Sequence, residues 1–212
     1  MSKKLGSILA GAGLAAASLI ALAGPAHATD WTVSPGGNVT AANAPFTKVI
    51  AKDPLRGTQA ACSTASGAGT AVSGTVGSGT GVVSVTSLSA SNCIGPANAA
   101  VNITMNNLPW SMDAVSYDAA TGVTTGSVTG IKATYSNPTD GCVATVTGPG
   151  GGGGSVNGTY TNSTGRLVAG GASTLEVATV NASCSPAQIQ VGDPITLTGT
   201  LVVSPKQTIT SP

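Results

Sequence analysis

The chain has 212 residues, of which only 7% are charged, and its formal net charge is +1. Its eight lysine and arginine residues form no cluster dense enough for nucleic acid or an anionic membrane, so neither class of partner is expected. Aromatic residues make up only 3% of the chain, which leaves few rings for a core or a binding surface.

Residues 1–28 are predicted to be a secretory signal peptide. A pair of lysines precedes an apolar run from Leu5 to Ala23, and small residues lead to a cleavage position after Ala28. An uncleaved anchor is the alternative, but Pro25 and the high Gly and Ala content of the run argue against it. We therefore expect a secreted protein, extracellular or associated with the cell wall, without a stable membrane anchor.

The composition after residue 28 predicts an all-β protein. It includes 21 Val, 7 Ile and 29 Thr against 7 Leu, and β-branched residues favour strands over helices. Turn residues recur every eight to twelve positions or so, the rhythm of an antiparallel β-sandwich or barrel. We expect one domain, residues 29–203, followed by a C-terminal tail, residues 204–212, without a sorting motif.

Alternating or β-branched segments predict the strands in chain order. In residues 110–117, the period of two places Trp110 on the face opposite Tyr117. The glycine run at 148–154 is expected to be a flexible loop tip, since it lacks the lysine of a phosphate-binding loop. The clearest strands are predicted at residues 31–33, 46–50, 101–105, 110–117, 130–135 and 195–203.

The cysteines bracket two segments that resemble copies of one hairpin. Cys62 and Cys93 enclose the first copy, and Cys142 and Cys184 enclose the second. An even number of cysteines in an exported protein predicts disulfides, and four cysteines allow three pairings. Because each copy of a duplicated hairpin should carry its own bond, the pairs Cys62–Cys93 and Cys142–Cys184 are favoured, together with an internal pseudo-repeat.

Groups that support catalysis are scarce after the leader. The only histidine, His27, lies within the predicted signal peptide, so nucleophiles lack their usual base and zinc lacks its commonest ligand. Asp113 and Glu176 are the only carboxylates predicted inside strands, and as a pair they are the candidates for a glycoside hydrolase. We expect no enzymatic activity, no metal and no cofactor.

Aromatic residues offer the best candidates for binding. Trp110, Tyr117 and Tyr135 are suited to stacking on a polysaccharide of the cell wall or to lining an apolar pocket for a small ligand. The alternative is that a chain so poor in aromatic residues needs these rings for its core.

The densest basic cluster after the leader is formed by Lys48, Lys52 and Arg56. Three charges within nine residues are typical of a solvated strand and loop. A site for an anion or a wall polymer is the alternative.

Several segments resemble small secreted proteins of streptomycetes and related actinobacteria, an all-β group of unknown function. The resemblance implies secretion and carries over no catalytic residue. We therefore predict a secreted, non-catalytic structural or binding protein. The alternatives are a small-molecule carrier with an apolar pocket and a carboxylate-dependent glycoside hydrolase. The segments that carry the resemblance are Cys62–Gly67, Asn92–Pro96, Leu108–Trp110, Val115–Gly126 and Val203–Pro212.

Overall fold

The computed structural model describes residues 30–212, and in this part of the chain it is built of strands with two short 3-10 turns. The prediction of an all-β, antiparallel fold is confirmed. The predicted signal peptide, residues 1–28, lies outside the described residues. The strands are β1 (Trp31–Ser34), β2 (Gly37–Asn43), β3 (Val49–Lys52), β4 (Gln59–Ala71), β5 (Gly74–Val76), β6 (Val83–Ile94), β7 (Ala100–Asn106), β8 (Trp110–Asp118), β9 (Val123–Asn137), β10 (Cys142–Thr147), β11 (Gly154–Thr161), β12 (Arg166–Ser173), β13 (Leu175–Val180), β14 (Pro194–Ser204) and β15 (Thr208–Thr210), and the 3-10 turns are η1 (Pro96–Asn98) and η2 (Pro149–Gly151).

Twelve of the strands form one sheet that closes on itself. One circuit of antiparallel pairs runs β2–β4–β6–β8–β9–β11–β12–β14 and back to β2. A second runs β3–β4–β6–β7–β9–β10–β13–β14 and back to β3. The long strands β4, β6, β9 and β14 belong to both circuits, so the two circuits enclose one continuous interior.

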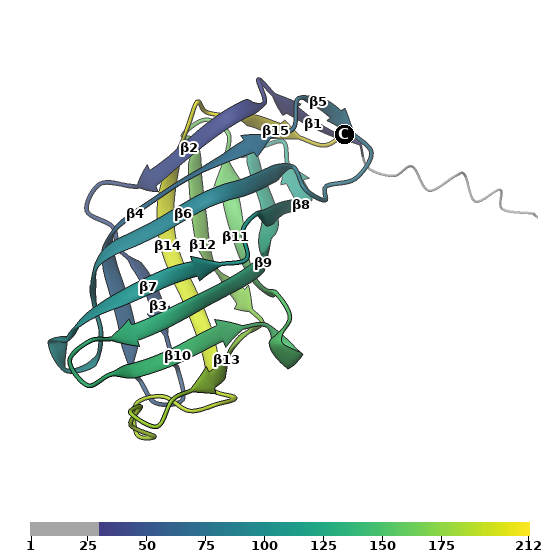
Figure 1. Ribbon diagram of the computed structural model, residues 1–212. Coiled ribbons are helices and arrows are strands. Elements are labelled where there is room, and N and C mark those ends of the chain that lie inside the picture. The colour runs from purple at the N-terminus through teal and green to yellow at the C-terminus, as the bar shows by residue number, and fades with distance from the viewer. Residues whose placement is uncertain (1–29) are drawn as a thin grey trace, which may run out of the picture.

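Figure 1 shows the closed sheet as two facing layers whose strands cross, with β4, β6, β7, β9 and β10 in one layer and β11, β12 and β14 in the other. The separate sheet β15–β1–β5 lies across the upper end in this view. We call this side the upper end, and the side of β10 and β13 the lower end.

The alternation of β14 explains why the inside of the closed sheet is apolar. Ile195, Leu197 and Leu201 all line the interior, as the predicted period of two requires. Gly199 occupies the inner position between Leu197 and Leu201, where an added Cβ would come within 2.9 Å of a Val49 methyl group. A larger residue there would displace β3 from its place beside β14.

The segment 204–212, predicted to be a tail, is part of the fold. It contains β15, which pairs with β1 through Val33 and Ile209. Both side chains are buried in the apolar cluster at the upper end, which also includes Trp31 and Tyr160 and which we call the upper core. Gln207 is also buried. The segment is short and rich in turn residues, so its own sequence carries little sign of the pairing with β1.

The prediction that Trp110 and Tyr117 lie on opposite faces is wrong because β8 contains a β-bulge. Its register against β9 shifts between Ala114 and Ser116, and the extra residue, Val115, is exposed. A bulge reverses the alternation of the residues that follow it. Tyr117 therefore packs against the upper core instead of facing away from it, and Trp110 remains buried.

The glycine run at 148–154 is an exposed corner whose two ends pack against the sheet, and residues 149–153 are exposed. The Gly148 N–H donates a hydrogen bond to the Gly152 carbonyl oxygen, and the Gly152 N–H donates to that of Pro149. A Cβ on Gly153 would lie 2.6 Å from the Gly130 Cα, closer than two carbon atoms can pack. The absence of side chains thus allows this corner to lie directly against the start of β11 and the middle of β9.

Both disulfides have the predicted pairing, yet the two brackets differ in structure. Cys62 and Cys93 face each other on the neighbouring strands β4 and β6. Cys142, at the start of β10, is instead bonded to Cys184 in the loop after β13. The first disulfide therefore ties two strands of the sheet, and the second ties a loop to the sheet.

Candidate functional site: an apolar cavity and its two ends

The interior of the closed sheet contains a cavity of about 300 Å³. Its lining comes from strands on all sides of both circuits and is almost entirely apolar, with residues such as Val85, Leu88, Met105, Val128 and Leu197. The polar lining side chains lie mainly toward the two ends. The cavity is thus an apolar chamber with its polar groups confined largely to the ends.

Two of the three predicted binding aromatics line this cavity. Trp110 is 4% exposed, and its Nε1 donates a hydrogen bond to the Asn106 carbonyl oxygen at 3.0 Å. Tyr135 also lines the cavity, and burial raises the pKa of its hydroxyl. Tyr117 is not among the lining residues and packs against the upper core.

The upper end of the cavity is closed by a buried network around Gln207. The Tyr160 hydroxyl donates to the Gln207 carbonyl oxygen at 3.0 Å and accepts from the Gln207 backbone N–H at 2.8 Å. The Gln207 side chain accepts from the Gly36 N–H and donates to the Pro205 carbonyl oxygen. Burial raises the pKa of Tyr160. These polar groups are satisfied, so the upper end offers none of them to a ligand.

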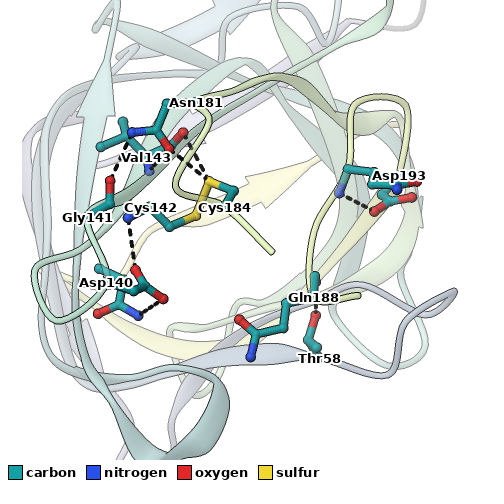
Figure 2. Close-up of a disulfide and its surroundings, with 11 residues drawn as sticks. Thr58, Asp140, Gly141, Cys142, Val143, Asn181, Cys184, Gln188 and Asp193 are labelled. Atoms are coloured by element: carbon teal, nitrogen blue, oxygen red, sulfur yellow. Dashed lines mark hydrogen bonds between the residues drawn. A yellow bond between two sulfur atoms is a disulfide. The ribbon is translucent and has the colours of Figure 1, made fainter. Parts of the chain in front are cut away.

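The lower end is bridged by residues 181–193, which connect β13 to β14 and which we call the strap. Figure 2 shows the Cys142–Cys184 disulfide on one side of this end and Asp193 on the other. Asn181 fixes the first part of the strap, since its side chain accepts from the Val143 N–H and donates to the Gly141 carbonyl oxygen. One side of the strap is therefore held by both a covalent bond and hydrogen bonds.

The other side of the strap is held by the turn between β3 and β4. The Thr58 hydroxyl donates to the Gln188 carbonyl oxygen at 2.8 Å (Figure 2). Gln188 and Ile189 of the strap line the cavity, as does Thr58. Ile189 also packs against a second apolar cluster, which includes Ile131, Val177 and Ile195. The strap thus forms part of the cavity wall.

A charged cluster joins the same turn to the end of the strap. The Arg56 guanidinium donates to Asp193 through Nε at 2.5 Å and through a terminal nitrogen at 3.1 Å. It also donates to the Gln190 side-chain oxygen at 2.6 Å. The hydrogen bond from Arg56 lowers the pKa of Asp193, and the Gln190 N–H adds to this effect. Asp193 is 4% exposed, so its charge is held by these donors.

Asp53 is the second carboxylate of the cluster and lines the cavity. It is 3% exposed. Its Oδ1 accepts hydrogen bonds from the N–H groups of Leu55 and Arg56. Its Oδ2 lies 3.9 Å from the Arg56 Nε, too far for a hydrogen bond, and has no hydrogen-bond donor within residues 30–212.

Sequence reasoning placed Arg56 in a solvated basic cluster with Lys48 and Lys52, and it missed the role of the carboxylates. Asp53 and Asp193 each precede a proline, which is typical of turns. The shared Asp-Pro dipeptide was the one available signal. This dipeptide could not show that Arg56 contacts Asp193, which lies 137 residues further along the chain.

The paired carboxylates considered for glycoside hydrolysis lie outside the cavity lining. Asp113 accepts hydrogen bonds from the Gly81 N–H, the Ser111 hydroxyl and the Thr129 hydroxyl. Its carboxylate is thus occupied in holding the turn before β6 against β8. Glu176 stands on β13, opposite Pro194 of β14. The enzyme alternative stays an untested prediction.

Fold and site together define a closed, disulfide-bonded all-β protein with an apolar interior cavity. The chain matches no family model, no curated protein and no solved structure with which it was compared. Within residues 30–212, no helix is long and apolar enough to cross a membrane.

Proposed function

We propose that the protein is a secreted, non-catalytic binding protein that carries a small apolar molecule in the cavity of its closed sheet. The observation that carries this proposal is the apolar chamber of about 300 Å³. That volume lies at the lower limit of ligand pockets, which span about 300–1,000 Å³ and are lined mainly by apolar and aromatic side chains.

The energetic cost of an empty chamber supports an occupant. At about 24 cal/mol per Å³ of cavity, an unfilled volume of this size costs about 7 kcal/mol. The net stability of a typical domain is only about 5–15 kcal/mol. Water is a poor occupant, because apolar cavities of this kind stay dry. An apolar ligand would recover much of the lost packing.

The burial of the aromatic residues favours a cavity ligand over a wall polysaccharide. Stacking on a polymer needs rings at the surface, but Trp31 and Trp110 are 3% and 4% exposed. Tyr160 is buried as well. Both tryptophans and Tyr160 are therefore placed for contacts in the interior, whereas Phe46 is fully exposed.

The proposed location outside the cell rests on the predicted leader and on the disulfides. Two disulfides account for all four cysteines of the chain. Such bonds persist in oxidising environments, and the predicted cleavage after Ala28 would release the mature chain there.

The test is binding of a neutral fluorescent apolar probe, N-phenyl-1-naphthylamine, to the mature protein. We expect saturable binding of one probe per chain, and the substitution Ala169→Leu should weaken it about tenfold or more, because Ala169 lines the cavity. The matched control is Ala172→Leu on the same strand, β12, where the side chain is exposed and outside the cavity lining. Equal affinity of both variants and the wild type would overturn the proposal.

A further inference from the structure

The lower end of the cavity carries a buried negative charge that the protein itself leaves partly unpaired. The cluster holds two carboxylates, Asp53 and Asp193, and among the described residues Arg56 is the only cation that forms a salt bridge with either. Lys52, the last residue of β3, is exposed. The cluster therefore has a formal charge of −1.

The two carboxylates do not share Arg56 equally. Arg56 donates two hydrogen bonds to Asp193 and one to Gln190. Asp53 Oδ2 is left 3.9 Å from the guanidinium and without a hydrogen bond from any described residue. Removing such an oxygen from water without a partner costs several kcal/mol in an apolar setting.

The free oxygen belongs to a residue that lines the cavity. Asp53 Oδ1 is engaged by the backbone of its own turn, through Leu55 and Arg56, so Oδ2 is the oxygen available to an occupant. Thr58 and Gln188 line the cavity nearby, but the Thr58 hydroxyl already donates its proton to the Gln188 carbonyl oxygen. No described residue donates a hydrogen bond to Asp53 Oδ2, so a ligand that carries a donor complements this oxygen.

We propose that the ligand is an amine with an apolar hydrocarbon chain. Its ammonium group donates a hydrogen bond to Asp53 Oδ2 beneath the strap, and its hydrocarbon chain fills the chamber. This inference rests on the proposed function and deepens it. An ammonium group supplies both the missing donor and the missing positive charge. An alcohol supplies the donor only, and a carboxylate would add a like charge to the cluster.

The upper end cannot provide the same selectivity. There the Tyr160 hydroxyl and the amide groups of Gln207 are all engaged with each other or with the neighbouring backbone. An amphiphilic ligand therefore has a single preferred direction in the cavity, with its polar group at the lower end.

The experiment is displacement of bound N-phenyl-1-naphthylamine by octylamine, octanol and octanoate at pH 7. The three compounds share an eight-carbon skeleton and differ in the polar group at its end. We expect octylamine to bind about tenfold more tightly than octanol, the effect of one charge-assisted hydrogen bond. Octanoate should be the weakest of the three.

Asp53→Asn is the decisive variant, because an asparagine Oδ1 can still accept the bonds from Leu55 and Arg56 while the charge is lost. It should remove the preference for octylamine, measured as the ratio of the octylamine and octanol affinities within the same variant. Asp118→Asn is the matched control: Asp118 also accepts the N–H of a residue two positions later in its turn, and it lies outside the cavity lining. The preference for octylamine should persist in this control.

The possible failures separate the two proposals. Equal binding of the three compounds to the wild type, or a preference for octylamine that survives Asp53→Asn, would overturn the ammonium inference and leave the carrier proposal standing. If neither the probe nor any of the three compounds binds, the carrier proposal fails and the inference fails with it.

Discussion

The two ends of the closed sheet are sealed by different means. At the upper end, the sheet β15–β1–β5 contributes Trp31, Val33 and Ile209 to a continuous apolar core. At the lower end, a loop is held in place by the Cys142–Cys184 disulfide, by side-chain hydrogen bonds of Asn181, Thr58 and Gln190, and by the ion pair of Arg56 with Asp193. The upper closure is made of secondary structure, whereas the lower closure depends on a few individual contacts.

This difference separates folding from access to the cavity. An end built from paired strands opens only when much of the protein unfolds, but a loop held by a few contacts can open locally at a lower free energy. Under the carrier proposal, a ligand would enter and leave at the strap. Each prediction below changes one end and compares the consequence with the other.

The largest effect is expected from removing a disulfide. The loops closed by Cys142–Cys184 and Cys62–Cys93 span 42 and 31 residues, so in the chain-entropy model each bond stabilises the fold by about 4 kcal/mol. Replacing either pair with serine should lower the free energy of unfolding in urea by a similar amount. Only the Cys142→Ser, Cys184→Ser variant should also speed the release of bound probe in stopped-flow measurements.

The paired variants serve as controls for each other, since they differ in what the bond holds. If loss of Cys62–Cys93 accelerated probe release as much as loss of Cys142–Cys184, the strap would not be the route of access. Equal release rates in both variants and the wild type would contradict the comparison in the same way.

A loss of stability alone is expected at the upper end from Tyr160→Phe. The substitution removes the hydroxyl that both donates to and accepts from the Gln207 backbone, and it leaves two buried polar groups without partners. Each such group costs about 1–3 kcal/mol, so we expect the free energy of unfolding to fall by about 2–6 kcal/mol. Probe release should be unchanged, because the strap is intact.

Tyr117→Phe is the control for this prediction. Tyr117 packs against the same upper core, but its hydroxyl makes no side-chain hydrogen bond with the described residues. Its loss should change stability by about 0.5 kcal/mol or less. A similar loss in both variants would mean that the network at Gln207 contributes nothing beyond packing.

The lower end shows why the sequence predicts the strands better than it predicts the closure. Alternation in residues 195–203 predicts the inner face of β14 correctly, because that pattern is local. The pairings of β14 with β2 and β3 join segments about 150 residues apart, and no local pattern specifies them. The prediction that Trp110 and Tyr117 lie on opposite faces was wrong for a related reason. A single bulged residue, Val115, reverses the alternation of β8 and leaves little trace in the composition.

The candidate site was predictable only in part. Trp110 and Tyr135 line the cavity, and their ring chemistry was the reason for choosing them. The contact of Arg56 with Asp193 could not be predicted, because it needs the closed sheet to bring two distant turns together. The predicted disulfide pairing is confirmed, but the hairpin argument behind it holds only for Cys62–Cys93, since Cys184 lies in the loop after β13.

The smallest effect is expected from acid at the Asp193 end of the strap. The hydrogen bond from Arg56 lowers the pKa of Asp193 below its ordinary value, which is about 3.9. A carboxyl group whose pKa is lowered on folding contributes stability above its ordinary pKa, and this contribution is lost as the pH falls through the folded value. The strap should therefore be fully held at neutral pH and loosen only below about pH 4.

The amide proton of Gln190 reports on this change directly, because it donates to Asp193 Oδ2 at 2.6 Å. Its hydrogen-exchange protection factor should fall as the pH is lowered below about 4, while amides of β15 at the upper end keep their protection over the same range. In Asp193→Asn the Gln190 amide should be less protected at pH 7 and should show little further change in acid. An equal fall of protection at both ends would indicate global acid unfolding, and the lower end would then not be the weaker closure.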